Sequence, residues 1–155
     1  RLNAVRSLID SGKICNTFSV RDNIFIQLEY DVFINMEVLG VEIRLKNDKN
    51  EVILFTYDDA NKSTRKELKR DPGRYVSTCK IPKDFLNNGR YWINVTIGDE
   101  SKTYIPGENM IFFEVSDSKD PEGARGHWIL SGSFPPAVVR PKLDWDITHK
   151  PFKEQ

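Results

Sequence analysis

Apolar and polar residues alternate with a period of two along most of the chain, and helical periodicity is nearly absent. In the longest case, from Asn23 to Ile34, every second residue from Ile24 onward is apolar. A strand with one apolar and one polar face is typical of an antiparallel sheet that covers a core. The same alternation predicts further strands over 39–46, 51–57, 75–81, 90–97 and 110–115, and a short piece at 102–105.

Turn sequences separate these predicted strands, at Asn47 to Asn50, Asp71 to Gly73 and Asn87 to Gly89. The polar segment 58–71 is predicted to be a loop with one helical turn at 65–68. Seven or more short strands joined by turns indicate an all-β fold. We expect an antiparallel β-sandwich of immunoglobulin-like or jelly-roll type.

The immunoglobulin-like arrangement also predicts how the strands divide between two sheets. If 23–34 and 74–81 share one sheet, strand 90–97 is central in the other. The second sheet then contains the strands over 39–46, 51–57, 90–97 and 110–115.

Length and charge narrow the class of protein. The 155 residues are 39% hydrophobic and suit a single domain over 1–155. The 23 basic residues balance 23 acidic ones, which argues against a nucleic-acid partner. No apolar run approaches the roughly 18 residues of a membrane span, so no direct membrane insertion is expected. Because the chain begins Arg1-Leu2-Asn3, we expect a domain of a longer protein.

The tail over about 124–155 differs from the rest, because it is rich in glycine, proline and tryptophan. Its apolar pieces at 128–130 and 137–139 are predicted to be edge strands. We expect the tail to dock on its own sandwich in cis or on a partner copy. The favoured form is a homodimer with Trp128 or Trp145 at the interface, because a tethered strand is easily exchanged between copies.

The sequence offers little support for catalysis, a cofactor or a metal site. No phosphate-binding loop is present, and His127 and His149 lack the spacing of a zinc site. Most carboxylates fall in predicted turns, although a glycosidase that uses sheet carboxylates stays an alternative. Cys15 and Cys79 are predicted to be free, small apolar residues inside strands, which favours a reducing cytosol. We therefore predict a non-enzymatic protein.

Trp92 is the most informative anomaly, because it lies on the polar side of a predicted strand. An indole on a solvated sheet face is costly unless something covers it. A sugar ring has an apolar C–H face and a rim of hydroxyl groups, so a tryptophan among polar residues matches it. The competing explanation is that the tail packs over Trp92.

The sheet assignment places other side chains beside Trp92. Arg44 can pair with an anionic group on a sugar chain. The facing of Tyr57 is ambiguous. Either Val52 and Leu54, or Ile53, Phe55 and Tyr57, can form the inward face of this strand. The predicted carbohydrate-binding residues are Glu42, Arg44, Tyr57, Trp92, Asn94, Phe112 and Glu114.

The order of the motifs resembles one protein family. These motifs are Phe18–Asp22, Val41–Asp48, Pro72-Gly73-x-Tyr75, Ile81-Pro82, Leu86–Tyr91, Ile111–Val115, Arg125-Gly126 and Val139–Trp145. Together they are similar to the C-terminal carbohydrate-binding domain of the ATP-binding subunit of bacterial polysaccharide ABC exporters, the Wzt type. The resemblance covers about residues 5 to 146.

The resemblance implies a cytoplasmic β-sandwich at the inner face of the bacterial inner membrane. Its partners would be the nascent O-antigen polysaccharide, a second copy of itself, the ATPase domain of the longer chain and the transmembrane subunit. It implies recognition of the modified non-reducing end of the glycan, so that cargo is selected for export. A domain that only dimerises the ATPase, without touching glycan, is the alternative.

Overall fold

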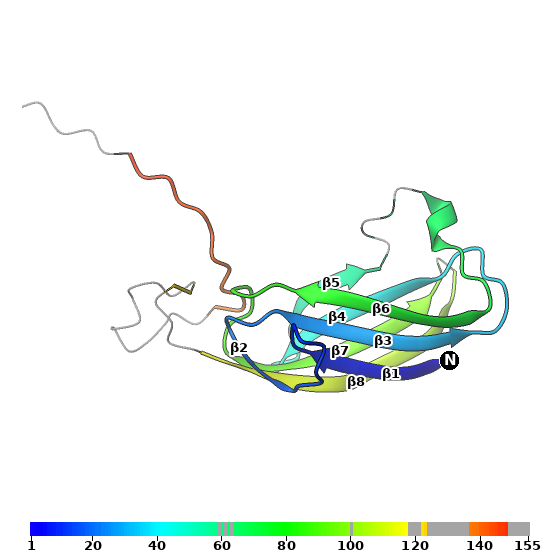
Figure 1. Ribbon diagram of the computed structural model, residues 1–155, viewed down its shortest axis with the longest axis horizontal. Helices are drawn as coiled ribbons and strands as arrows, with labels where there is room; N and C mark the ends of the chain where they lie inside the picture. The colour runs from blue at the N-terminus through cyan, green and yellow to red at the C-terminus, as the bar shows by residue number, and fades with distance from the viewer. Residues whose placement is uncertain are drawn as a thin grey trace, which may run out of the picture.

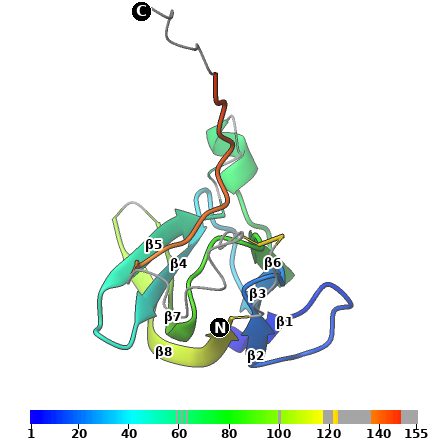
Figure 2. The ribbon, with the colours of Figure 1, turned by 90° about the vertical axis from the view of Figure 1, so that its left-hand side faces the viewer.

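The computed structural model describes residues 1–58, 60, 62, 64–99, 101–117, 122–123 and 137–148. Two sheets pack face to face (Figures 1 and 2). One sheet has the order β1 (Leu2–Leu8), β3 (Ile24–Val32), β6 (Gly73–Ile81). The other has the order β2 (Thr17–Ser19), β8 (Thr103–Ser116), β7 (Gly89–Gly98), β4 (Gly40–Asn47), β5 (Val52–Tyr57). The predicted all-β sandwich, its two-sheet division and the central place of β7 are confirmed.

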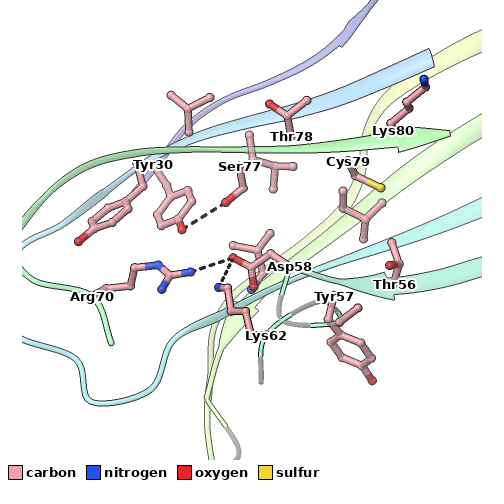
Figure 3. Close-up of a pocket in the computed structure, with 16 residues that line it drawn as sticks. Tyr30, Thr56, Tyr57, Asp58, Lys62, Arg70, Ser77, Thr78, Cys79 and Lys80 are labelled. Atoms are coloured by element: carbon pink, nitrogen blue, oxygen red, sulfur yellow. Dashed lines mark hydrogen bonds and ion pairs between the residues drawn. The ribbon is translucent and has the colours of Figure 1, made fainter. Parts of the chain in front are cut away.

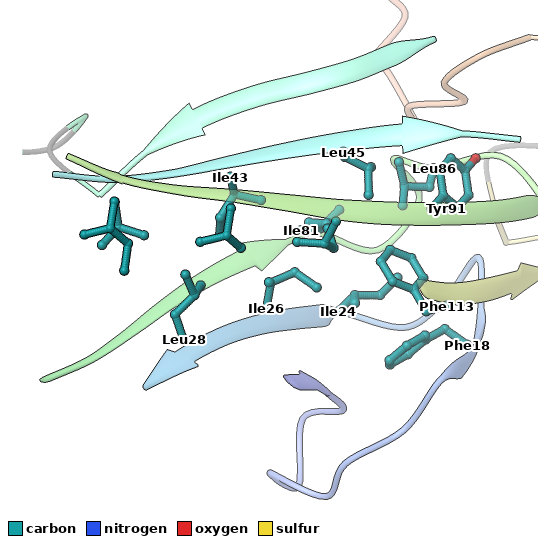
Figure 4. Packing of buried hydrophobic residues seen from close by; sticks show 14 of the residues in the cluster. Phe18, Ile24, Ile26, Leu28, Ile43, Leu45, Ile81, Leu86, Tyr91 and Phe113 are labelled. Carbon is teal, nitrogen blue, oxygen red and sulfur yellow. The ribbon is translucent and has the colours of Figure 1, made fainter. Parts of the chain in front are cut away.

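The core lies between the sheets, where the period-two alternation points every second side chain inward (Figure 4). On β3, Ile24, Ile26 and Leu28 are buried, and on β7 Ile93 and Val95 are fully buried. These residues face each other across the two layers, so the apolar face of each predicted strand forms one half of the same core.

The N-terminal segment forms two strands that the alternation did not predict. β1 pairs antiparallel with β3, and its register shifts between Leu2 and Ala4, which breaks the period-two pattern. β2 pairs with β8 in parallel, so the second sheet is not purely antiparallel. Phe18 of β2 is buried edge to face against Phe113, with ring centroids 5.6 Å apart. The segment thus crosses from one sheet to the other and covers one side of the sandwich.

Two irregularities change the strands that were predicted. The expected pieces at 102–105 and 110–115 form a single strand, β8, whose register against β7 shifts between Ile93 and Val95. Asn109 takes a left-handed conformation there, with φ 48°. In β5 the pairing shifts between Leu45 and Lys46, so Val52 lies outside although Leu54 lies inside. The predicted helical turn at 65–68 is present as a 3₁₀ helix, η1 (Arg65–Leu68).

The described part of the tail docks in cis on the segment before β7. Val139 forms an isolated bridge with Leu86, in place of the edge strand expected at 137–139. The backbone N–H of Arg140 donates to the Phe85 carbonyl over 2.8 Å, and its guanidinium pairs with Asp117 at 3.2 Å. Beyond these contacts, 143–148 extends away from the sandwich (Figure 1). The predicted strand at 128–130, Trp128, His127 and His149 lie outside the described residues.

Both cysteines are free. Cys79 lies on β6 as expected, and burial raises the pKa of its thiol. Cys15 precedes β2 and is not in a strand, which corrects its predicted placement. Its thiol donates a hydrogen bond to the Thr17 carbonyl over 3.0 Å.

Candidate functional site

The predicted binding residues lie together on the outer face of the five-stranded sheet, here termed the aromatic face. Cross-strand register brings Trp92 opposite Phe112, and Arg44 opposite both Asn94 and Phe55. Glu42 lies opposite Thr96 on one side and Tyr57 on the other. The bulge in β5 resolves the facing of Tyr57, which is directed outward.

Four aromatic rings form two pairs on this face. Trp92 and Phe112 are tilted against each other with centroids 6.4 Å apart, and Phe55 and Tyr57 meet edge to face at 4.7 Å. Phe55, Tyr57 and Phe112 each leave between 44% and 48% of their surface exposed. Such a row of half-exposed rings on one sheet face is unusual for a surface that stays in water.

Cations and carboxylates surround the rings. The Arg44 guanidinium lies 5.3 Å from the Phe55 ring centroid and donates to Glu42 over 2.6 Å. Arg90 lies 5.6 Å from the Phe112 centroid, and its Nε–H donates to Glu114 over 2.9 Å. Each arginine is therefore held both by a ring and by a carboxylate, which fixes its position beside the aromatic residues.

Two hollows in the surface adjoin Trp92. A hollow of about 330 Å³ is lined by Trp92, Arg90, Glu114 and Asp48, among others. A smaller one of about 160 Å³ is lined by Trp92, Lys46, Asp48 and residues of the adjoining turn. Trp92 thus borders two concave spaces that carry charged and amide groups at their rims.

A third hollow, of about 230 Å³, lies at the opposite end of the aromatic face, next to Tyr57, Glu42 and Thr96. Asp99 also lines it. Hydrogen bonds from Tyr104 and Ser101 hold the pKa of Asp99 well below its usual range. Asp99 therefore stays ionised, and this end of the face carries a fixed negative charge.

Asn94 differs from the other predicted residues, because it lies beneath the surface. It is 6% exposed, and its Oδ1 accepts a hydrogen bond from the Asn109 backbone over 2.9 Å. Gly107 lies at the same irregularity, where a Cβ would lie 3.1 Å from the Val95 carbonyl oxygen, so the close approach of the two strands favours glycine there. The contacts of Asn94 therefore hold the bend of β8 that carries Phe112.

The sequence-based list omitted residues that belong to this face. Phe55 is one, although it lies two residues before Tyr57 and shares its face in the alternation, so the signal that placed Tyr57 on the list applied to Phe55 as well. Arg90 could have been included from its position two residues before Trp92. Lys46 and Asp48 line the hollows beside Trp92 from a neighbouring strand and its turn, which only the sheet order brings close.

Among the described side chains, no group of three or more His, Cys, Asp and Glu residues is placed to hold a metal ion. In the same part of the chain, no helix is long and apolar enough to cross a membrane. The chemistry that the described face offers is ring stacking, hydrogen bonding and ion pairing.

Comparison with known proteins adds to this geometry. A crystal structure of the C-terminal domain of Wzt aligns with a TM-score of 0.69 and 10% sequence identity, covering 96% of this chain and 83% of that one. The chain has the fold of the Wzt C-terminal domain. The resemblance inferred from the motifs is confirmed at the level of the fold. No family model matches the sequence, and no curated protein matches it.

Two other solved structures align more loosely. The CARDB domain of a Pyrococcus furiosus protein, in complex with di-metal ions, has a TM-score of 0.38 at 15% identity, covering 76% of this chain and 90% of that one. A β-glucosidase from Listeria innocua, in complex with gluconolactone, has a TM-score of 0.37 at 7% identity, covering 75% and 15%.

Proposed function

We propose that this domain binds a polysaccharide chain on its aromatic face, without catalysis, and selects it as cargo for an ABC exporter. The observation that carries the proposal is the set of half-exposed rings, Phe55, Tyr57 and Phe112 with Trp92, held among ion-paired side chains. Sugar rings have apolar C–H faces that stack on aromatic rings, and hydroxyl groups that bond to charged and amide groups.

Individual residues take different roles in this proposal. Trp92 stacks on one sugar ring, and the hollows that adjoin it hold the neighbouring sugars. Arg44 has 39% of its side chain exposed, so it reaches an anionic substituent while staying bonded to Glu42. Glu114 and Glu42 accept hydrogen bonds from sugar hydroxyls. Asn94 acts as a positioning residue for β8.

The proposed setting follows from the fold and the motif resemblance. As a domain with the Wzt C-terminal fold, it would lie in the cytoplasm at the inner membrane, joined to an ATPase domain and working with a transmembrane subunit. Its cargo would be the nascent O-antigen, recognised near the modified non-reducing end. ATP hydrolysis would belong to the ATPase domain.

A homodimer is the second part of the proposal, and the end of the described tail supports it. Leu143, Trp145 and Ile147 alternate with polar residues, and each is at least 65% exposed. This period-two pattern is that of a strand without a sheet, and a tryptophan left 85% exposed is costly in water. We propose that this segment packs on a second copy.

Light scattering of the intact chain beside a chain that ends at Lys142 tests the dimer. The shorter chain keeps the contacts of Arg140 with Phe85 and Asp117, so its fold is expected to be unchanged. We expect a dimer for the intact chain at tens of micromolar concentration, on the order of ordinary interface affinities, and a monomer for the shorter one. If the intact chain is monomeric, or if both the intact and the shorter chain are dimeric, the proposed role of the tail in dimerisation is contradicted.

Calorimetric titration with the O-antigen polysaccharide of the source organism tests glycan binding. We expect saturable binding with a dissociation constant on the order of micromolar to millimolar, because sugar hydroxyls exchange bonds to water for bonds to protein. Chromatography of the glycan after incubation is expected to show no product. Absence of binding would favour a purely dimerising domain, and cleavage would favour a glycosidase.

A further inference from the structure

A further and larger cavity lies on the side of the sandwich that the N-terminal strands do not cover. Here β5 and β6 are edge strands, each paired with one neighbour, and a cleft of about 690 Å³ separates them (Figure 3). We term it the open-edge cleft. Its volume falls within the range of about 300 to 1,000 Å³ that is usual for small-molecule sites.

The bottom and walls of the open-edge cleft are mostly apolar. Leu28, Val41 and Ile43 of the core close its bottom. Ser77 and Cys79 point into it from β6, while Thr78 and Lys80 on the same strand point away (Figure 3). The hydroxyl of Ser77 already has the Tyr30 hydroxyl as a partner, at 3.4 Å. This part of the cleft therefore suits an apolar body.

The loop end of the cleft is cationic. Arg70 Nη2 lies 3.1 Å and Lys62 Nζ 3.9 Å from the same oxygen of Asp58, whose other oxygen accepts the Val41 backbone N–H. Only 10% of the Arg70 side chain and 23% of the Lys62 side chain are exposed. Asp58 is the one carboxylate among the described residues that line the cleft. Among the described residues of the cleft, two poorly hydrated cations thus meet one carboxylate. Arg70 Nη1 already donates to the Glu67 and Lys69 carbonyls, at 3.0 and 3.1 Å, so a further anion is favoured on the Lys62 side of the pair.

We propose that the open-edge cleft is a second ligand site, which takes a small molecule with an apolar body and one anionic group. The apolar body lies on Ile43 and Leu28 beside Cys79, and the anionic group lies beside Lys62 and Arg70. The rest of the aromatic face lies on the other side of the five-stranded sheet, and Tyr57 alone of its residues borders the cleft as well. The proposed ligand contacts do not include Tyr57, so this site does not depend on glycan binding.

A fatty acid has an apolar body with one acid group, so octanoate is the probe, and glucuronate, whose body carries hydroxyl groups, is its acidic but polar counterpart. Octanol is the uncharged counterpart of octanoate. Cys79 reports occupancy in a Cys15→Ser background, where the serine hydroxyl keeps the bond to the Thr17 carbonyl. Because burial raises the pKa of the Cys79 thiol, its alkylation by N-ethylmaleimide is followed at mildly alkaline pH.

We expect octanoate to slow Cys79 alkylation about tenfold at saturation, and octanol and glucuronate to have little effect. No protection by octanoate, or equal protection by octanol or glucuronate, would overturn the proposal.

Lys62→Gln tests the cationic end, because it removes one charge and leaves the ion pair of Arg70 with Asp58 in place. We expect it to weaken protection roughly fivefold. Lys49→Gln, on the exposed turn between β4 and β5, is the matched control and is expected to change nothing. Equal protection in Lys62→Gln and the parent would overturn the assignment. Glycan titration of the same variant separates this outcome from failure of the aromatic face, since Lys62→Gln is expected to keep glycan binding.

Discussion

The outer faces of the two sheets are both polar in the alternation, but they arrange their charges differently. On the three-stranded sheet, carboxylates and arginines pair with each other across strands: Arg6 with Glu29 at 3.1 Å, and Arg74 and Arg1 with Asp31 at 2.9 and 2.7 Å. On the aromatic face, Arg44 and Arg90 each lie over a ring as well as beside a carboxylate, whereas of the three arginines on the other sheet only Arg1 does so, over Phe33 just after β3.

The aromatic residues on the two faces differ in the same way. Phe25, on the outer side of β3, has the Lys80 ammonium 5.8 Å from its centroid and is half-buried. Phe112 and Tyr57 on the aromatic face each remain 48% exposed. Within its strands, the outer face of the three-stranded sheet exposes Val76 at 58% but no ring as far as Phe112 and Tyr57, so the aromatic face has the more exposed aromatic surface. We therefore expect substitutions on the two faces to affect different properties.

The largest expected effect is that of Trp92→Ala on glycan binding. Removing the indole abolishes the stacking surface, and we expect the dissociation constant for the polysaccharide to rise tenfold or more, a loss of about 1.4 kcal/mol at least. Because Trp92 lies on the outer face, the melting temperature is expected to change by only a few degrees. Calorimetric titration and thermal melts measure the two quantities.

Phe25→Ala is the matched control for Trp92→Ala, because it removes an aromatic ring from the other outer face. We expect unchanged glycan affinity in this variant. If Trp92→Ala lowers the stability strongly and keeps binding, Trp92 is a structural residue and the contrast between the faces is lost.

Arg44→Gln and Arg74→Gln form a second pair with a smaller expected effect. Arg44→Gln removes a cation beside the rings, so we expect it to weaken glycan binding about threefold to fivefold, with a stronger loss for an acidic glycan. Arg74→Gln breaks pairs with Asp31 and Glu29 and is expected to leave glycan affinity unchanged. Calorimetric titration with the glycan measures the affinity of both variants. Equal losses of affinity in the two would show that only the net charge matters.

The smallest expected effect concerns acid stability of the three-stranded face. Hydrogen bonds from Arg74, Asn3 and Arg1 hold the pKa of Asp31 well below its ordinary value of about 3.9. Its contribution is therefore complete above the unfolded pKa and is lost as the pH falls through the lower folded pKa. Urea unfolding at a series of pH values below about 5 measures this contribution. We expect the free energy of unfolding to fall less steeply with decreasing pH in Asp31→Asn than in the parent.

Arg74→Gln serves as the check on this explanation, since Arg74 is the main partner that lowers the Asp31 pKa. As in Asp31→Asn, we expect the free energy of unfolding of Arg74→Gln to fall less steeply than that of the parent as the pH decreases. The prediction is contradicted if the free energy of unfolding depends on acidic pH in the same way in the parent and in Asp31→Asn.

The sequence by itself determined the strands whose side chains alternate, and with them the core. Residues such as Ile26, Leu28 and Ile93 are fully buried because a period of two sends every second side chain to one face. The polar side of β7 was equally clear, so Trp92 could be picked out before the fold was known. Arg44 and Glu42 followed in the same way, because their strand alternates without interruption.

The tertiary structure decided what alternation does not encode. β1 and β2 are short strands that exist through pairing with β3 and β8, and the bulges that turn Phe55 outward and bend β8 at Asn109 depend on neighbouring strands. The cis docking of Val139 and Arg140 and the open-edge cleft depend on sheet edges that meet only after folding. The physical reason is that periodicity is a property of one strand, whereas register, bulges and edges arise between strands.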